Sequence, residues 1–188
     1  GLIMRPVVEA SKAAHRRIVF AEGEDERVLH AAHAMREQTM DAPILIGRPQ
    51  VILTRAESAG IPISEEHYTI VNPEDYPVYE EYCRSYLDLM KRKGVTPDLA
   101  RAVMRTNTTA MGAVMVHNGD ADSLICGTFG QYLWHLNYVT QILGSERLAP
   151  IGALSLMILE TDVLFIADTH VHTEPTAEAI ASIVMGAA

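Results

Sequence analysis

The chain has 188 residues, 48% of them apolar, and a formal net charge of −9. This composition supplies a core without a low-complexity run, so it indicates one folded domain, or one domain and part of another. The negative charge argues against nucleic acid as a partner, because nucleic-acid binders need a positive field to displace counterions. A phosphate-bearing ligand would therefore have to be met by local arginines.

Cysteine usage and hydropathy both favour a cytoplasmic protein. The two cysteines, Cys83 and Cys126, lie in apolar patterns, which fits a reducing compartment better than a disulfide framework. No apolar run is long enough to span a membrane, and residues 1–17 lack the apolar centre of a signal peptide. We therefore expect a cytoplasmic chain that does not bind a membrane.

The first part of the chain alternates between apolar strands and amphipathic helices. We expect strands at 18–21, 42–47, 68–71 and 123–126, and helices at 24–38, 49–59, 76–92, from Pro97, at 108–117 and at 131–143. A further short helix is possible at 6–16. Such alternation is typical of a parallel sheet with helices on both faces.

The pattern changes near residue 148. Strands are expected at 153–159 and 163–167, joined by a turn at 160–162, and a last helix at 175–185. A hairpin and one helix do not make a stable domain. We therefore expect a lead-in from an upstream domain (1–16), an α/β domain (17–147) and the start of a second, incomplete α/β domain (148–188).

The stretch 105–144 predicts one wall of a ligand site. A strand passes through Gly127-Thr128-Phe129-Gly130 into a helix, which places free N–H groups and a positive dipole end at the carboxyl edge of a sheet. Anions are often bound there, although many such connections bind nothing. Asn107 is expected to cap the helix 108–117. The polar corner Thr106–Thr108 either holds an anion or carbonyl, or is only a capped corner.

Two other polar stretches are weaker site candidates. Glu22, Asp25 and Glu26 precede or open a helix, where carboxylates favour the dipole and repel an anion, so we expect helix-start roles for them. The stretch Asp168–His172 holds a His-x-His pair, but no later carboxylate or histidine completes a metal shell. We expect no metal site, and spacing alone supports no catalytic set.

Five stretches carry a family resemblance: VFAEGEDERVLHAA, PILIGRP, VNPEDYPVYEEY, RKGVTPDLARAVMRTNTTAMGAVMVHNGDADSLICG and FIADTHVHTEPTAEAIA. They resemble the phosphotransacetylase family, and more closely the phosphotransacetylase-like C-terminal domain of the large bacterial NADP-dependent malic enzymes. The resemblance implies a three-layer, parallel-sheet α/β fold of two domains, like that of the isocitrate and isopropylmalate dehydrogenases. It also implies a dimer of these domains within a larger homo-oligomer.

The sequence differs from the acetyltransferases of this family in two ways. Asn137 stands where the family has an arginine that meets phosphate, and a neutral amide cannot supply a charge-assisted contact. The family's later serine-arginine and aspartate elements would lie beyond Ala188. We therefore expect no catalytic residue here. The oxidative decarboxylation of malate to pyruvate would belong to upstream domains that hold NADP and a divalent metal.

The resemblance therefore favours a regulatory and assembly domain with acetyl-CoA as allosteric effector. The residues expected to contact the effector are Thr106, Asn107, Thr108, Gly127, Thr128, Gly130, His135 and Asn137. Two alternatives stay open: an active phosphate acyltransferase that uses acetyl phosphate and CoA, and a purely structural oligomerisation module.

Overall fold

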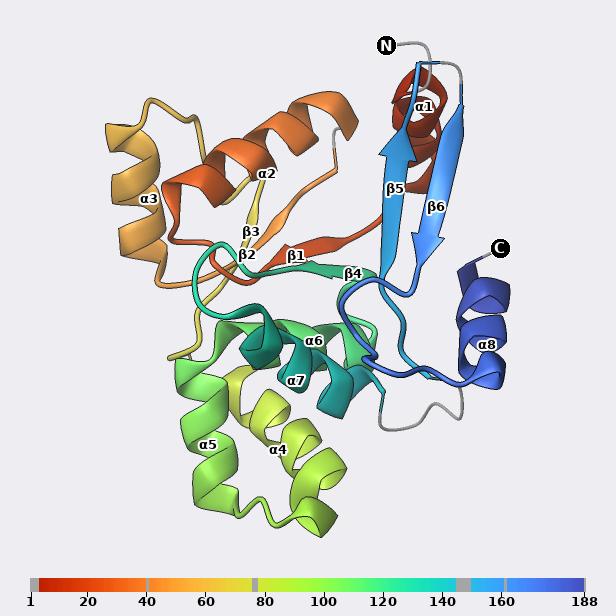
Figure 1. The fold of residues 1–188 in the computed structure, drawn as a ribbon. Coiled ribbons are helices and arrows are strands. Elements are labelled where there is room, and N and C mark those ends of the chain that lie inside the picture. The colour runs from red at the N-terminus through yellow and green to blue at the C-terminus, as the bar shows by residue number, and fades with distance from the viewer. Residues whose placement is uncertain (1–3, 40, 76–77, 145–149, 161, 188) are drawn as a thin grey trace. The chain divides into compact units, whose positions relative to one another are not determined.

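The computed structural model describes residues 4–39, 41–75, 78–144, 150–160 and 162–187 (Figure 1). The chain divides into two compact units, one ending at Leu143 and one beginning at Gly144. The predicted boundary, between residues 147 and 148, lies outside the described residues. So do residues 76 and 77 of a predicted helix and residue 161 of the predicted turn.

In the described part of the first unit, four parallel strands form one sheet in the order β3-β2-β1-β4. They are β1 (Ile18–Phe20), β2 (Ile44–Ile46), β3 (Thr69–Val71) and β4 (Ser123–Ile125). The chain builds outward from β1 to β3 and then crosses to the other side of β1 to form β4. Ligands of open α/β sheets bind at the carboxyl edge where the strand order reverses in this way.

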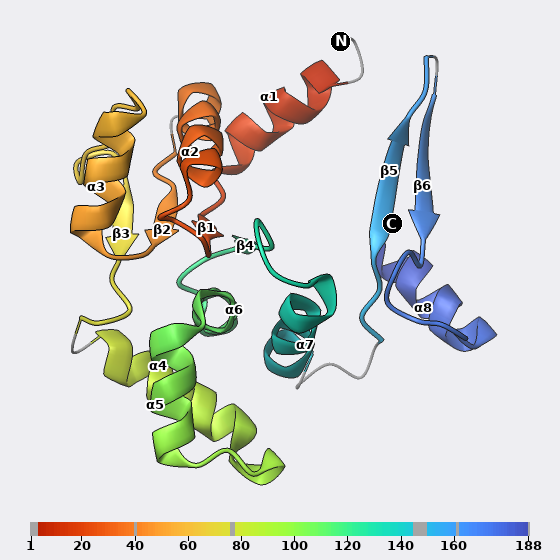
Figure 2. The ribbon, with the colours of Figure 1, turned by 60° about the vertical axis from the view of Figure 1, so that its left-hand side comes forward.

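The helices of this unit are α1 (Met4–Ala14), α2 (Glu26–Thr39), α3 (Pro49–Ser58), α4 (Val78–Met90), the 3₁₀ turn η1 (Lys91–Lys93), α5 (Pro97–Thr106), α6 (Thr108–Asn118) and α7 (Tyr132–Leu143). Figures 1 and 2 show α2 and α3 on one face of the sheet and α4 to α7 on the other. The predicted parallel sheet with helices on both faces is confirmed.

Alternating strand residues divide the interior into two cores. Phe20 and Leu45 pack with α2 and α3. Val19, Ile44 and Ile46 pack on the other face with α4, α5 and α6. Because successive side chains of a strand point to opposite faces, each short strand serves both layers. The sheet is therefore held from both sides, and the loops at its carboxyl edge have a rigid base.

The predicted caps at the α5–α6 corner are confirmed. Thr96 Oγ1 accepts a hydrogen bond from Leu99 N at 3.2 Å, with Pro97 opening α5. Asn107 Oδ1 accepts one from Ala110 N at 2.9 Å and so starts α6. Gly119 ends α6 with a φ of 83°, a left-handed conformation that glycine adopts without a Cβ clash.

The second unit contains the predicted hairpin and helix: β5 (Leu154–Ile158) pairs antiparallel with β6 (Val163–Ala167), and α8 (Ala177–Ala187) follows. Asp168 organises the end of the hairpin. Its buried side chain accepts hydrogen bonds from Ala153 N at 2.7 Å and His172 N at 3.0 Å, and it lies 2.6 Å from His172 Nδ1. These contacts give the aspartate and one histidine of the His-x-His stretch a structural role.

Candidate ligand cleft at the carboxyl edge of the first sheet

A cleft of about 570 Å³ lies at the carboxyl ends of β1 and β2. This volume falls in the usual range for small-molecule sites, roughly 300–1,000 Å³. Among the described residues, charged side chains of both signs line it: Glu22, Glu24, Asp25, Arg48, Arg55, Glu74 and Arg105. The sheet thus places basic groups at the edge where its topology predicts a ligand.

Arg48 and Glu24 form the main ion pair of the cleft. Arg48 donates from Nε to Glu24 Oε1 and from Nη2 to Oε2, both at 2.8 Å, and its backbone N donates to Oε1 at 2.9 Å. Arg55 Nη1 donates to the Glu24 carbonyl oxygen at 2.7 Å. The contact with Arg48 holds the pKa of Glu24 below its usual range, so this carboxylate is charged at neutral pH.

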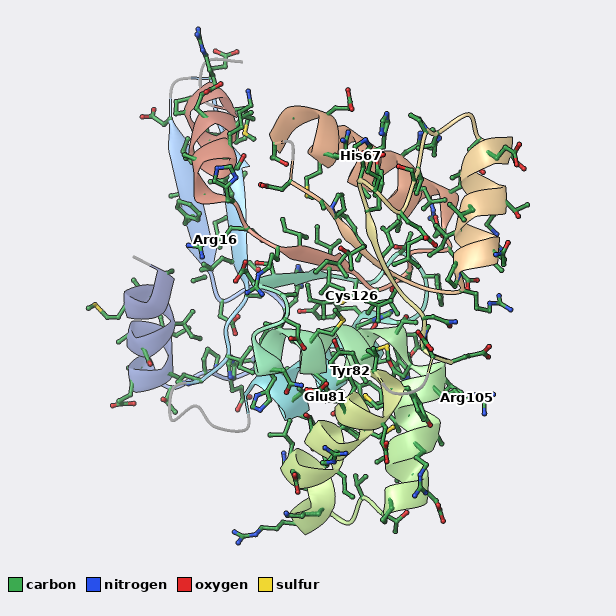
Figure 3. All side chains as sticks on the ribbon, turned by 180° about the vertical axis from the view of Figure 1, so that it is seen from behind. Arg16, His67, Glu81, Tyr82, Arg105 and Cys126 are labelled. Carbon is green, nitrogen blue, oxygen red and sulfur yellow. The ribbon has the colours of Figure 1, made fainter. Side chains whose placement is uncertain are left out.

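Arg105 is the more loosely held cation of the cleft. It lies at the end of α5 (Figure 3), with Nη2 4.0 Å from Glu74 Oε1 and a side chain that is 63% exposed. Thr108, the first residue of α6, also lines the cleft. Arg105 can therefore turn toward a ligand at the cost of one long, solvent-exposed ion pair.

Glu22 has a different role from the one predicted. Asp25 does start α2, because its Oδ1 accepts a hydrogen bond from Arg27 N at 2.9 Å. The buried Glu22 instead accepts bonds from Gly127 N at 2.9 Å and Thr128 Oγ1 at 3.2 Å. The sequence did contain a signal for this contact. Glu22 and Gly127 each follow a strand, and parallel strand ends meet at one sheet edge.

Polar groups of the glycine loop are therefore already hydrogen-bonded to other residues of the chain. The Gly127 N–H, the expected anion donor, already binds the Glu22 carboxylate. Arg27 Nη2 donates to the Thr128 carbonyl oxygen at 3.2 Å. A ligand anion at the Gly127 N–H would have to displace Glu22.

His135 is buried and bonded through both ring nitrogens. Nε2 lies 2.7 Å from the Phe129 carbonyl oxygen, and Nδ1 lies 2.8 Å from Thr109 Oγ1. Because a carbonyl only accepts, Nε2 carries the proton, and Nδ1 can accept from the threonine hydroxyl. His135 thus fastens α7 to α6 and to the glycine loop.

A second cleft of about 340 Å³ lies beside the glycine loop, and Cys126, Gly127, Gly130 and His135 are part of its wall. Burial raises the pKa of the Cys126 thiol (Figure 3), which keeps it protonated and weakly nucleophilic at neutral pH. The geometry therefore offers a shaped, mainly apolar surface and not an activated nucleophile.

The structure separates the predicted contact residues. Thr108 lines the first cleft, while Gly127, Gly130 and His135 line the second. Asn137 lines neither of these two clefts; it is exposed, and its Oδ1 accepts from Gln141 Nε2 at 2.9 Å.

The remaining three predicted residues are bonded within the chain. Thr106 Oγ1 donates to the Ala102 carbonyl oxygen at 2.8 Å, Asn107 caps α6, and Thr128 bonds Glu22. The arginines of the first cleft were not among the predicted contacts, although Arg105 adjoins the predicted polar corner.

Comparison with solved structures identifies the fold. EutD phosphotransacetylase from Staphylococcus aureus superimposes with a TM-score of 0.80 at 23% identity, covering 96% of this chain and 55% of that one. A phosphotransacetylase from Streptococcus pyogenes gives a TM-score of 0.79 at 24% identity. The expected phosphotransacetylase-like fold is confirmed.

Sequence comparison then gives the family. The phosphate acetyl/butaryl transferase family matches residues 2–188, and the chain belongs to it. The NAD-dependent malic enzyme of Rhizobium meliloti is 47% identical over all of this chain and 25% of its own length. The NADP-dependent malic enzyme of Escherichia coli is 40% identical with the same coverage. The phosphate acetyltransferase of Corynebacterium glutamicum is 32% identical, over 94% of this chain and 53% of its own length. The chain thus spans a quarter of the malic enzymes that it matches.

Proposed function

We propose that this chain is the phosphotransacetylase-like regulatory and assembly domain of a malic enzyme, with acetyl-CoA as its allosteric effector. Malic enzymes match its whole length at 40–47% identity, which supports that context. Malate would be oxidised and decarboxylated to pyruvate in upstream domains that hold the nicotinamide coenzyme and a divalent metal. NADP remains our prediction for that coenzyme, since the relatives include both NAD- and NADP-dependent enzymes. We also propose a cytoplasmic location, in keeping with the free cysteines.

The observation that carries the effector proposal is the arginine-bearing cleft. Acetyl-CoA presents phosphate groups, and arginine recognises phosphate through charge-assisted, often bidentate hydrogen bonds. Arg48, Arg55 and Arg105 come from two helix regions and meet at one cleft in a chain whose net charge is −9. An effector that favours one arrangement of the oligomer would change activity in the upstream domains through differential affinity.

An acyltransferase reaction in this domain has less support. Asn137 is exposed and bonded to Gln141, and Glu22 engages the Gly127 N–H. Neither group offers a positive charge to acetyl phosphate. An assay of acetyl-CoA formation from acetyl phosphate and CoA by the full-length protein separates the two functions. Turnover there would favour the enzyme.

The assembly role is supported by an exposed apolar surface around the start of α7. Phe129, Tyr132, Leu133 and Trp134 are each 46–69% exposed. Several large, exposed apolar side chains close together in the chain are consistent with a contact between proteins. If the full-length protein is a stable oligomer that binds no acyl-CoA in calorimetry, the purely structural alternative is the correct one.

The proposed function is tested by adding acetyl-CoA to the full-length protein that contains this chain and following malate-dependent reduction of NAD or NADP. We expect a saturable change in activity that is absent from a form lacking this domain. No change at any acetyl-CoA concentration would overturn the effector proposal.

A further inference from the structure

We propose that Glu24 is an internal competitor for the phosphate of the effector: a phosphate group binds the side chain and the backbone N–H of Arg48 after the Glu24 carboxylate has left them. This inference rests on the proposed function and concerns the same cleft. It names the side chain that must leave, and it places the phosphate on Arg48, the N-cap residue of α3.

The Glu24 carboxylate already occupies an anion site. Arg48 is the N-cap residue of α3, and its backbone N–H and two guanidinium nitrogens all bind this carboxylate, at 2.8–2.9 Å. A guanidinium fork beside a backbone N–H group is also suited to two oxygens of a phosphate. The donors that bind the Glu24 carboxylate are therefore also suited to a ligand phosphate.

Gly47 makes room for this contact. A Cβ atom at Gly47 would lie 2.8 Å from Glu24 Cγ, so a side chain there would push the carboxylate away from Arg48. The strand-to-helix turn is therefore shaped to accept the glutamate.

Glu24 can leave without unfolding its surroundings. It lies between β1 and α2, and α2 is started by Asp25, so release of Glu24 leaves that cap in place. The Glu24 and Arg48 side chains are 24% and 57% exposed, which gives the exchange access to solvent. Arg55 binds the Glu24 carbonyl oxygen and not the carboxylate, so it can hold the backbone while the side chain turns.

The charges that line the cleft indicate that Glu24 weakens the binding of phosphate. Among the described lining residues, Glu22, Glu24, Asp25 and Glu74 stand against three arginines. With Glu24 in place, a ligand phosphate meets a neutralised Arg48 and three further carboxylates. With Glu24 turned away, Arg48 is released for the ligand. The affinity for phosphate-bearing ligands is therefore set partly by this one side chain.

The test is a calorimetric titration of the full-length protein with CoA, and separately with inorganic pyrophosphate as a phosphate-only probe. Glu24→Gln keeps the size of the side chain but removes the charge that competes. We expect it to bind both probes about tenfold more tightly than the wild type, because hydrogen bonds to charged groups are roughly twice as strong as neutral ones. Arg48→Gln is expected to weaken both by about tenfold.

Glu26→Gln is the matched control. It removes the same charge two residues away, at a side chain that is 68% exposed and not part of the cleft wall. We expect its affinities for both probes to stay within about twofold of those of the wild type.

Glu24→Asp provides a second test, since its shorter side chain keeps the charge but cannot reach all three Arg48 donors. It too should tighten binding, and circular dichroism checks that each variant is folded.

Unchanged or weaker binding of both probes by Glu24→Gln and Glu24→Asp would overturn the inference. If acetyl-CoA still changes the activity of such variants as it does in the wild type, the proposed function stands and the phosphate binds elsewhere. If neither the wild type nor any variant binds CoA, the inference and the effector proposal both fail.

Discussion

At the scale of single residues, the buried Glu22 carboxylate has the largest consequence for the site. Its two oxygens bind Gly127 N and Thr128 Oγ1, groups more than 100 positions later in the chain. Glu22→Ala would remove two hydrogen bonds to a charged group, and we expect a loss of about 1–3 kcal/mol in the free energy of unfolding. Urea unfolding measures this, with the exposed Glu26→Ala as control. Equal losses in the two variants would contradict the assigned role.

Asp122 makes a separate prediction about pH. Arg17 donates to it from its backbone N and from its side chain, and these hydrogen bonds lower the pKa of Asp122 to about 2 from an ordinary 3.8. A lowered carboxyl pKa stabilises the fold above the ordinary value and loses that effect as the pH falls toward the folded-state value.

Asp122→Asn should therefore be less stable than the wild type at neutral pH, with a difference that shrinks below about pH 4 and disappears near the folded-state pKa. Thermal unfolding across this pH range measures it. Asp88→Asn, in an exposed pair with Lys91, serves as control. A difference that does not change with pH would show that the charge of Asp122 is not the cause.

At the scale of elements, the Thr109–His135 hydrogen bond fastens α6 to α7. Thr109→Val keeps the side-chain shape but removes the donor to His135 Nδ1, which is buried. We expect a loss of about 1–3 kcal/mol in unfolding free energy. Thr106→Val, at an exposed helix end, should cost no more than about 0.5 kcal/mol. Chemical denaturation of both variants decides, and similar losses would mean that the contact contributes little.

Local sequence patterns predicted the elements but not the contacts between distant loops. The strand at Ile18–Phe20 and the cap at Asn107 depend on apolar spacing and on a neighbouring N–H group, so nearby residues specify them. The partners of Glu22 and of Arg48 follow from strand order and the relative position of two turns. Strand positions bring Glu22 and Gly127 to one sheet edge, but spacing along the chain does not say which groups at that edge pair with each other. The predicted contacts therefore omitted the arginines of the cleft, although the prediction did place a ligand site at the sheet edge where the cleft lies.

At the scale of the whole molecule, the two units differ in how they bury apolar side chains. The first has a core on each face of its sheet. In the second, the hairpin residues Leu154, Leu156, Met157, Ile158, Leu159, Val163, Leu164, Phe165 and Ile166 are each 40–64% exposed. A two-stranded hairpin is marginal by itself. These apolar faces therefore fit the assembly part of the proposed function, in which other protein surface covers them.

The binding of acetyl-CoA at the arginine cleft is the central claim, and equilibrium binding of acetyl-CoA to the full-length protein tests it most directly. Arg105→Gln removes the more loosely held cation of the cleft, and we expect about a tenfold weaker affinity. Arg101→Gln, one turn earlier in α5 and outside this cleft, should leave the affinity within about twofold of the wild type. Equal affinity in the wild type and both variants, or no binding at all, would contradict the account.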